Sequence, residues 1–195
     1  MKQKKYTLLI DQDDVLAEYI QGVTKAYNEK YNTCISASEC VSWNLYQVFG
    51  TEVDTVMHEP ELFKKLEPVK NAIEVFERLY KSELFEMYIV TAANPTCVPA
   101  KVEWLKKYLP FFPVDRVIFC QRKYMIKGDF LLDDGMHNIE EFQKAGGTPI
   151  IFERPHNEFK GKGILRVKDW LSFEKLIMQI CYPKQVEEDV TETAI

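Results

Sequence analysis

An apolar run that ends in a group of carboxylates constrains the fold of this chain more than any other feature. Residues 7–10 read Thr-Leu-Leu-Ile, and Asp11, Asp13 and Asp14 follow before the apolar pattern resumes at Val15. The run predicts a buried parallel strand. Burying charge is costly, and open parallel sheets bind ligands at the carboxyl ends of their strands. The acids therefore indicate a site for a cation or for proton transfer rather than a solvated turn.

The composition permits one domain with an insertion. The chain has 195 residues, of which 46% are hydrophobic, so it can bury a sizeable core. Its net charge of −5 argues against a general binder of nucleic acids or anionic membranes. Five cysteines without a CxxC spacing argue against a disulfide scaffold and a structural zinc site. The first residues contain too few apolar side chains for a signal peptide or a membrane span, so we expect a cytoplasmic protein.

Strand-like and helix-like segments alternate along most of the chain. This alternation predicts an α/β fold with a Rossmann-like parallel sheet flanked by helices. Further buried strands are expected at 87–91, 117–119, 130–132, 149–152 and 164–167. Helices are expected at 71–81, 99–108, 138–144 and 170–180. Gly146 and Gly147 are typical of a helix end.

Residues 17–66 interrupt the alternation directly after the acidic strand. They begin with a helix-like segment to about Tyr31 and continue as an aromatic stretch of short helices. We therefore predict a small helical cap over 17–66, and a core domain made of 1–16 and 67–182. Residues 183–195 are polar and acidic without an apolar period, so they are predicted to be a disordered tail.

Polar side chains follow four of the predicted strands. In chain order they are Asp11 with Asp13, Thr91, Lys123, and Asp133 with Asp134. Because the carboxyl ends of parallel strands share one edge, we expect these side chains to lie together. Adjacent aspartates repel each other unless a cation is present. The set fits phosphoryl transfer: Mg²⁺, a lysine and a hydroxyl neutralise a phosphate, one aspartate attacks phosphorus, and a second carboxylate transfers the proton.

The order Asp-x-Asp-x-Val-Leu, strand–Thr, Lys and Asp-Asp resembles the four motifs of the haloacid dehalogenase superfamily. The resemblance implies that Asp11 is the nucleophile and a Mg²⁺ ligand. Asp13 would be the acid/base and would give its backbone carbonyl to the metal. Asp134 would complete the metal site, with Asp133 in a supporting role. The phosphate-binding positions that the resemblance implies are Thr91, Ala92 and Lys123. An aspartate at position 13 favours a phosphatase over a dehalogenase or an ATPase.

Within this superfamily the chain is similar to the 5'(3')-deoxyribonucleotidases. The likeness lies in the small cap after the first motif, the spacing from Lys123 to the paired aspartates, and the segment 63–68 that leads into a helix. It implies a small nucleotide substrate whose base stacks on aromatic residues of the cap. The candidate base contacts are Tyr19, Trp43 and Phe63. The alternative is that these rings pack the cap's own core.

Three positions depart from the family's pattern. Gln12 and Asp14 replace the usual Met and Gly of the first motif. Ala92 stands where a phosphate-holding Ser is usual, so backbone N–H groups would have to take over that contact. Lys127 is a rival of Lys123 for the phosphate position, and the spacing favours Lys123.

These observations predict a magnesium-dependent phosphomonoesterase that hydrolyses (deoxy)ribonucleoside monophosphates through an aspartyl-phosphate. They leave open the preferred base and sugar, the 5' or 3' position of the phosphate, and a homodimer. The alternatives are a phosphatase with the same mechanism acting on another metabolite, such as a sugar phosphate, and a non-catalytic binding module on this fold. A small cap would enclose the site, so neither a nucleic-acid polymer nor a membrane is an expected partner.

Overall fold

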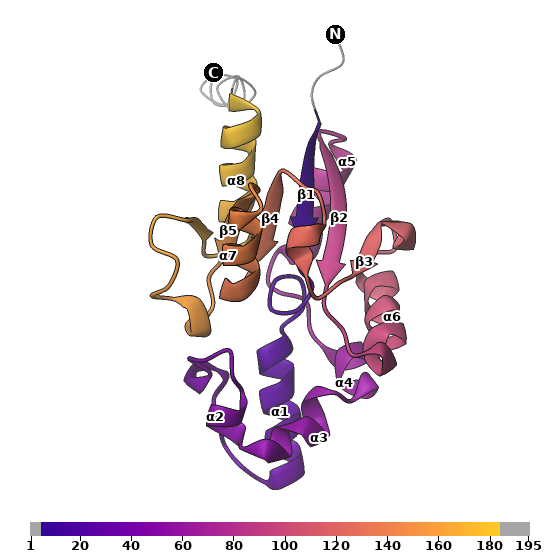
Figure 1. Cartoon of the computed structure of the whole chain (residues 1–195). Helices are drawn as coiled ribbons and strands as arrows, with labels where there is room; N and C mark the ends of the chain where they lie inside the picture. Colours follow the sequence, from indigo (N-terminus) through magenta and orange to yellow (C-terminus); the bar gives the residue numbers. More distant parts are fainter. Residues whose placement is uncertain (1–4, 184–195) are drawn as a thin grey trace, which may run out of the picture.

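The computed structural model describes residues 5–183. One sheet lies at its centre, and a separate group of helices lies beyond the carboxyl ends of the strands (Figure 1). All strands pair in parallel in the order β3-β2-β1-β4-β5-β6. Their bounds are β1 (Tyr6–Ile10), β2 (Phe85–Thr91), β3 (Val117–Phe119), β4 (Phe130–Asp133), β5 (Thr148–Phe152) and β6 (Leu165–Val167). The predicted α/β fold with a Rossmann-like parallel sheet is confirmed. The predicted disordered tail lies, from residue 184 onward, outside the described residues.

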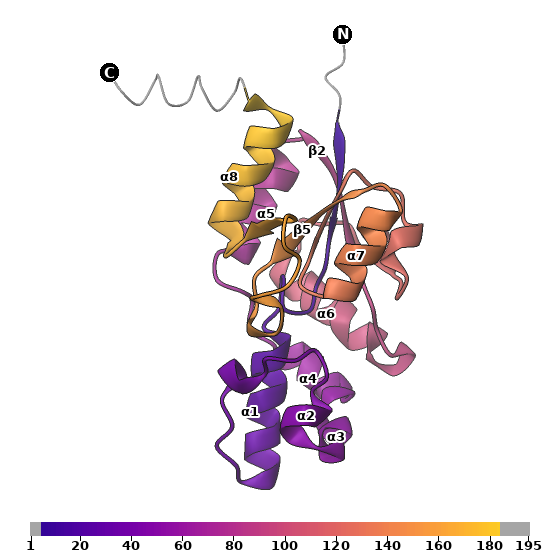
Figure 2. The same cartoon turned by 60° about the vertical axis from the view of Figure 1, so that its left-hand side comes forward.

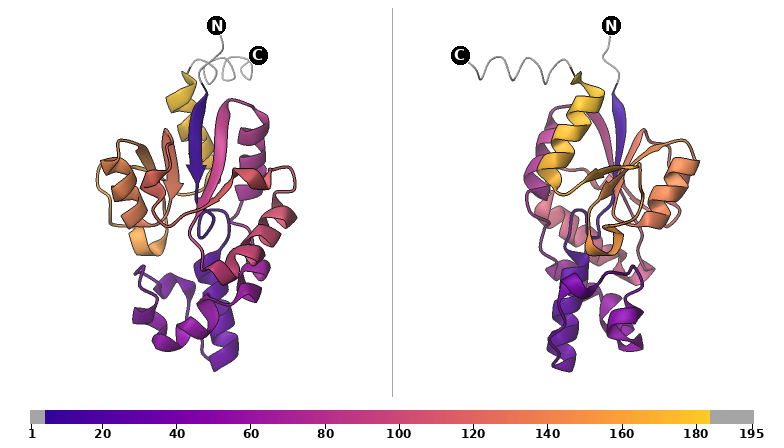
Figure 3. Two further views of the ribbon diagram at one scale, coloured as in Figure 1. Left: turned by 45° about the vertical axis from the view of Figure 1, so that its right-hand side comes forward. Right: turned by 90° about the vertical axis from the view of Figure 1, so that its left-hand side faces the viewer.

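Helices cover both faces of the sheet. They are α5 (Ala72–Lys81), α6 (Val98–Tyr108), α7 (Met136–Lys144) and α8 (Trp170–Cys181), each within two residues of its predicted bounds. Figure 2 and the right view of Figure 3 show α5 and α8 on one side of the strands and α7 on the other. Alternate residues of β1 serve the two faces, because Leu8 and Ile10 join the large core cluster while Leu9 packs with Phe142 of α7. The central strand is therefore buried on both faces.

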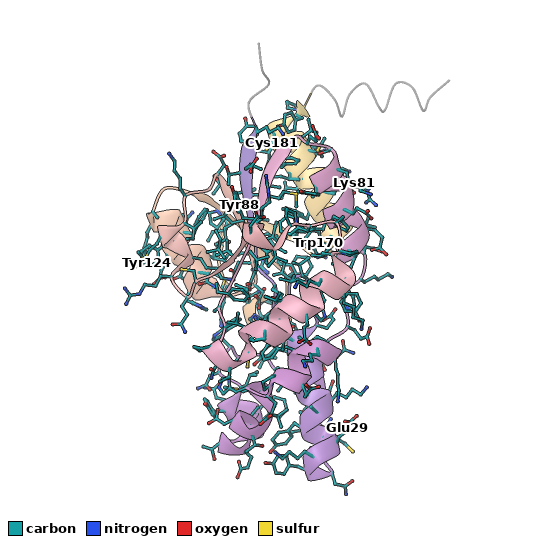
Figure 4. The ribbon with its side chains drawn as sticks, turned by 90° about the vertical axis from the view of Figure 1, so that its right-hand side faces the viewer. Glu29, Lys81, Tyr88, Tyr124, Trp170 and Cys181 are labelled. Carbon is teal, nitrogen blue, oxygen red and sulfur yellow. The ribbon has the colours of Figure 1, made fainter. Side chains whose placement is uncertain are left out.

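Local sequence explains where the covering helices begin and what they bury. In α5, the buried residues Ala72, Val75, Phe76 and Leu79 recur at helical spacing and form one apolar face. Helix α8 begins after Asp169, whose carboxylate accepts a hydrogen bond from the backbone N–H of Ser172 at 2.7 Å. Figure 4 places Trp170, at the start of α8, among the side chains packed beside the sheet.

The segment between β1 and α5 forms one long and three short α-helices that lie apart from the sheet. They are α1 (Tyr19–Tyr31), α2 (Tyr46–Phe49), α3 (Asp54–Met57) and α4 (Pro60–Lys65). Figures 1 and 4 show this group beyond the carboxyl ends of the strands, with Glu29 at the end of α1 away from the sheet. We call residues 17–66 the cap. Gly22 allows α1 and the residue after α4 to approach closely, since a Cβ there would lie 2.2 Å from Cδ2 of Leu66.

Two linkers join the cap to the core: the outgoing linker runs from β1 to α1, and the returning linker runs from α4 to α5. The outgoing linker pairs with the returning linker through two backbone hydrogen bonds. The N–H of Glu18 donates to the carbonyl of Glu67 at 2.9 Å, and the N–H of Val69 donates to the carbonyl of Leu16 at 2.8 Å. The linkers are therefore held to each other as well as to the core.

Two buried tryptophans fix the linkers to the helices of the core. The indole N–H of Trp170 donates to the carbonyl of Val15 at 2.8 Å, and that of Trp104 donates to the carbonyl of Leu66 at 2.8 Å. A buried indole N–H needs an acceptor, so each contact satisfies a polar group while fixing one linker. The cap consequently starts and ends at well-defined points above the sheet.

Candidate active site

The ends of three neighbouring strands bring most of the predicted site residues together. β1 lies between β2 and β4, so Asp11, Thr91 and Asp133 end adjacent strands at the edge that faces the cap. The backbone N–H of Asp11 continues the pairing, since it donates to the carbonyl of Leu132 at 3.0 Å. All three side chains are buried. This edge is therefore a recessed polar site inside a largely apolar core.

Lys123 reaches this site from the short turn that follows β3. Its Nζ lies 2.6 Å from Oδ1 of Asp11 and 2.6 Å from Oδ2 of Asp133, and only 2% of its side chain is exposed. Burial alone would lower the pKa of Lys123, but the two carboxylates raise it above its ordinary value, so the ammonium stays charged. Lys127, the rival candidate, is exposed. The structure thus brings Lys123, and not Lys127, to the carboxylates.

Asp133 has its carboxylate occupied by neighbouring donors. Besides Lys123, it accepts hydrogen bonds from the backbone N–H of Gly135 at 2.8 Å and from Nδ2 of Asn138 at 3.0 Å. These donors hold its side chain in place and orient Lys123 toward Asp11. Asp133 therefore supports the other groups of the site.

The carboxylates of Asp11, Asp133 and Asp134 form a cluster suited to a cation. Their oxygens lie within 4.8 Å of one another, and Oδ1 of Asp134 is buried without a hydrogen-bond partner among the described residues. Burial, and then the neighbouring Asp133, raise the pKa of Asp134 well above the ordinary range, and burial raises that of Asp11 although Lys123 opposes it. One lysine does not balance so many buried acids. An all-oxygen donor set with surplus negative charge fits a hard divalent cation.

A second buried lysine, which the sequence reasoning missed, organises the other side of the site. Lys101 lies in α6, and its side chain is 1% exposed. Its Nζ donates to Oδ2 of Asp13 at 2.6 Å, to Oγ1 of Thr91 at 2.9 Å and to the carbonyl of Ala92 at 3.0 Å. It also lies 5.2 Å from the centre of the Phe63 ring in the cap. Lys101 therefore links three of the predicted site residues.

The sequence contains one signal that would have identified Lys101. Helix α6 buries Lys101 together with Trp104 and Leu105, which lie three and four residues further along the same face. A lysine on the apolar face of an amphipathic helix has to find a partner inside the protein. Lys106 and Lys107 in the same helix are exposed, and they make the segment read as an ordinary surface helix.

The three candidate base contacts fall into two groups. Tyr19 and Phe63 stack with ring centres 5.6 Å apart, and Phe63 is buried in the core cluster, as the packing alternative expected for it. Trp43 is half exposed and lies beside two histidines of the core, with its ring centre 5.1 Å from that of His137 and 5.2 Å from that of His156. The structure therefore does not bring all three aromatic rings together.

The positions that depart from the family's pattern have distinct surroundings. Asp14 is buried and has a φ of 54°, a left-handed conformation that explains why glycine is usual there and that aspartate tolerates. Gln12 is buried at 1% exposure. Ala92 is exposed, and its carbonyl accepts the hydrogen bond from Lys101.

His156 is a further neighbour of the site that the sequence reasoning did not single out. It is buried in the loop after β5, and its Nε2 lies 2.9 Å from Oδ2 of Asp134. Burial lowers the pKa of the His156 imidazole. The adjacent Asn157 donates through Nδ2 to the backbone carbonyl of Asp134 at 2.9 Å. The loop after β5 thus contacts both the carboxylate and the backbone carbonyl of Asp134.

Solved structures share this architecture. A haloacid dehalogenase-type hydrolase from Bacillus subtilis, solved with bound magnesium, aligns with a TM-score of 0.61 at 14% identity over 92% of this chain and 100% of that one. At this identity, the likeness concerns the fold. None of the helices within residues 5–183 has the length and apolar character needed to cross a membrane.

Curated proteins and a family profile identify the group more narrowly. The chain is 31% identical over 177 residues to the 5'(3')-deoxyribonucleotidase of Bacillus subtilis strain 168, and equally to that of Bacillus phage SPbeta, covering 89% of this chain and 99% of each relative. Residues 5–183 match the profile described as "5' nucleotidase, deoxy (Pyrimidine), cytosolic type C protein". The chain therefore belongs to this family of nucleotidase hydrolases.

Proposed function

We propose that the chain hydrolyses deoxyribonucleoside monophosphates to deoxyribonucleosides and inorganic phosphate, with Mg²⁺, through an acyl phosphate formed on the Asp11 carboxylate. The observation that carries the proposal is the pairing of two buried lysines with two functional aspartates. Lys123 contacts Asp11, and Lys101 contacts Asp13. The deoxyribonucleotide substrate is inferred from the names of the relatives.

In the first step, an oxygen of Asp11 attacks phosphorus while the bond from phosphorus to the nucleoside oxygen breaks. Lys123 holds Asp11 in position and offsets the charge of the approaching phosphate. Asp13 gives its proton to the leaving oxygen, so the nucleoside departs as a neutral alcohol. Lys101 contacts both Asp13 and Thr91, and we propose that the Thr91 hydroxyl binds a phosphate oxygen.

In the second step, water hydrolyses the aspartyl-phosphate. Asp13, now a carboxylate, takes a proton from the water as the water oxygen attacks phosphorus. The bond between phosphorus and the Asp11 oxygen breaks, which releases inorganic phosphate and restores the Asp11 carboxylate. The contact of Lys101 with Asp13 holds that side chain in place for this step.

Asp11, Asp134 and the backbone carbonyl of Asp13 are the groups that we propose would hold Mg²⁺. The buried Asp134 oxygen without a protein partner and the surplus of negative charge support this assignment. When bound, the ion would neutralise part of the phosphate charge and polarise the bond to the leaving oxygen. Asp133 keeps its supporting role because its oxygens already accept hydrogen bonds.

Among the cap aromatics, we assign base contacts to Trp43 and Tyr19. Trp43 is half exposed beside the loop that holds Asp134, so one face is open to a planar ligand. Tyr19 is partly buried, and Phe63 is buried behind it, so Phe63 positions Tyr19 rather than stacking on a base itself. We propose action in a reducing compartment such as the cytoplasm, since Cys34, Cys40, Cys97 and Cys120 form no disulfide within the described part of the chain. The homodimer that the sequence leaves open stays a prediction.

The test is phosphate release from a panel of monophosphates with Mg²⁺ or with EDTA. The panel contains dUMP, dTMP, dGMP, UMP, 3'-dUMP, glucose 6-phosphate and p-nitrophenyl phosphate. Magnesium-dependent release that favours the deoxyribonucleotides is the expected result. Release from glucose 6-phosphate but not from nucleotides would keep the mechanism and replace the substrate. A protein without activity on any compound would be a binding module.

The assignment of the nucleophile has its own test. Asp11→Asn removes the attacking oxygen's charge and should abolish turnover, whereas Asp13→Asn should form the aspartyl-phosphate slowly and turn over almost none of it. Mass spectrometry of the quenched protein should detect a phosphate group on Asp11 in wild-type protein and not in Asp11→Asn. Turnover at the wild-type rate in Asp11→Asn would exclude Asp11 as the nucleophile.

A further inference from the structure

Arg154, in the loop between β5 and β6, connects the core to the first linker of the cap. Its Nε donates to the backbone carbonyl of Asp14 at 2.6 Å, and its Nη1 lies 3.2 Å from Oε2 of Glu18. Glu18 is the residue that immediately precedes α1. Figures 1 and 2 show the segment after β5 extending from the sheet toward the cap. A single planar guanidinium therefore holds two points of the outgoing linker.

Asp14 also contacts the first helix of the cap, α1. Its carboxylate accepts the backbone N–H of Ile20, with Oδ1 at 3.0 Å and Oδ2 at 3.2 Å. Ile20 lies in the first turn of α1, where N–H groups have no partner within the helix, and Glu18 makes no side-chain cap. Asp14 is also three residues from Asp11. The backbone of one residue thus receives Arg154 while its side chain caps α1.

The same loop contacts the carboxylate cluster at its other end. His156 lies against Asp134 and against Trp43 of the cap, and Asn157 donates to the Asp134 backbone. Within four residues, the loop touches the outgoing linker, a proposed metal ligand and an exposed cap aromatic. Because the loop contacts both the cap and Asp134, it fixes the position of the cap relative to the carboxylates of the site.

We propose that Arg154 is a positioning residue for nucleotide hydrolysis, which sets the orientation of the cap above Asp11 by clamping the Asp14 carbonyl and the Glu18 carboxylate together. The inference rests on the proposed function, because it assigns the nucleoside part of the substrate to the cap. The side chains of Arg154 and Glu18 are 18% and 22% exposed, so solvent screens their pair less than a surface pair. A planar guanidinium offers the two acceptors separate N–H donors in a fixed geometry, whereas a lysine would have to reach both from a single nitrogen.

The kinetic test compares Arg154→Met, Arg154→Lys and Glu18→Gln with a matched control. The control is Arg78→Met, because Arg78 also forms a two-bond ion pair, with Glu174, but joins α5 to α8 on the surface of the core domain. We expect Arg154→Met to raise KM for dTMP about tenfold, the effect of losing a hydrogen bond to a charged group. p-Nitrophenyl phosphate has no nucleoside for the cap to contact, so its kcat and KM should change by less than about threefold. Glu18→Gln should add nothing to Arg154→Met in the double variant, and Arg154→Lys should recover only part of the affinity.

Equal losses on dTMP and p-nitrophenyl phosphate in Arg154→Met would overturn the proposal, and so would the same KM change in Arg78→Met. Each result would mean that Arg154 only stabilises the fold. The stability of every variant is followed by thermal unfolding, so that a loss of folded protein is not mistaken for a change in KM.

A second measurement does not depend on activity. Hydrogen exchange of the Ile20 amide in the full chain reports whether Asp14 still caps α1. We expect exchange at Ile20 to be about tenfold faster in Arg154→Met and unchanged in Arg78→Met, for the loss of one charged hydrogen bond. If wild-type protein hydrolyses no nucleotide, the proposed function fails, and the exchange result still decides whether Arg154 fixes the cap. Unchanged exchange in Arg154→Met would overturn the positioning role.

Discussion

At the scale of single residues, two buried lysines determine what the aspartates of the site can do. Lys123 neutralises Asp11 on one side, and Lys101 holds Asp13, Thr91 and the Ala92 carbonyl on the other. Each ammonium is surrounded by acceptors, so removing Lys123 leaves buried carboxylates without a partner and removing Lys101 leaves the partly buried Asp13 without one. The loss of one partner of a buried pair is much more damaging than the pair is stabilising.

Replacing Lys101 tests how far positioning of Asp13 matters. Lys101→Met keeps the length and apolar stem of the side chain but leaves Asp13 without its donor, so proton transfer should be impaired. We expect kcat for dTMP to fall about 100-fold or more, the lower end of what general acid–base groups contribute. Steady-state kinetics measures this, with Lys127→Met as the control, because Lys127 is exposed and should leave kcat unchanged. A Lys101→Met enzyme with wild-type kcat would contradict this role.

Apart from Lys123, the residues that sequence reasoning placed at the carboxyl ends of the strands end or directly follow a strand. Asp11, Thr91 and Asp134 could be located because a buried apolar run ends beside them, and parallel strands share one carboxyl edge. Lys101 and His156 reach the same place from a helix face and from a loop, where spacing along the chain carries no information about distance. Their roles depend on tertiary packing, which the strand pattern does not encode.

At the scale of elements, the end of α7 shows how two neighbouring glycines serve different purposes. Gly146 has a φ of 91°, and a Cβ there would meet no atom within 4 Å. Gly147 has no such backbone requirement, but a Cβ there would lie 2.2 Å from the ring of Phe142. The sequence predicted correctly that these glycines end the helix, but it did not indicate that only Gly147 makes room for a core aromatic.

This difference gives a prediction about stability. Gly147→Ala should lower the free energy of unfolding by about 1–3 kcal/mol through overpacking, and Gly146→Ala by about 1–2 kcal/mol through left-handed backbone strain. Combining each with Phe142→Leu separates the two causes in urea unfolding. The cost of Gly147→Ala should shrink in the Phe142→Leu background, whereas that of Gly146→Ala should add to it. Additive costs for both pairs would refute the packing argument for Gly147.

At the scale of the whole molecule, the buried carboxylates make stability depend on pH and on cations. The pKa values of Asp11 and Asp134 are raised in the folded protein, mainly by burial. From about pH 4, the ordinary aspartate value, up to their raised pKa values, the folded state therefore binds more protons than the unfolded state. Their contribution to the free energy of unfolding is present at low pH and is lost as pH rises through this window.

Divalent cations should reverse that loss near neutral pH. We expect Mg²⁺ at about 100 times its Kd to raise the free energy of unfolding by about 2.7 kcal/mol relative to EDTA. Asp134→Asn should lose most of this gain, and in EDTA its free energy of unfolding should fall less steeply with rising pH than that of wild-type protein. Urea unfolding at a series of pH values measures both effects. Equal stability of wild-type protein in Mg²⁺ and in EDTA at pH 7 would argue against the metal site.

The paired linkers make the cap an exchangeable unit. Because Glu18 bonds to Glu67 and Val69 bonds to Leu16, the insertion leaves and re-enters the core at neighbouring points. A loop of any length can close between points that are already adjacent, since the entropy of closure rises only slowly with loop length. The strands that end at Asp11, Thr91 and Asp133 all lie outside the segment between these bonds. Under our proposal that the cap contacts the nucleoside, replacement of this one inserted segment is the route by which substrate preference would diverge while the sheet is retained.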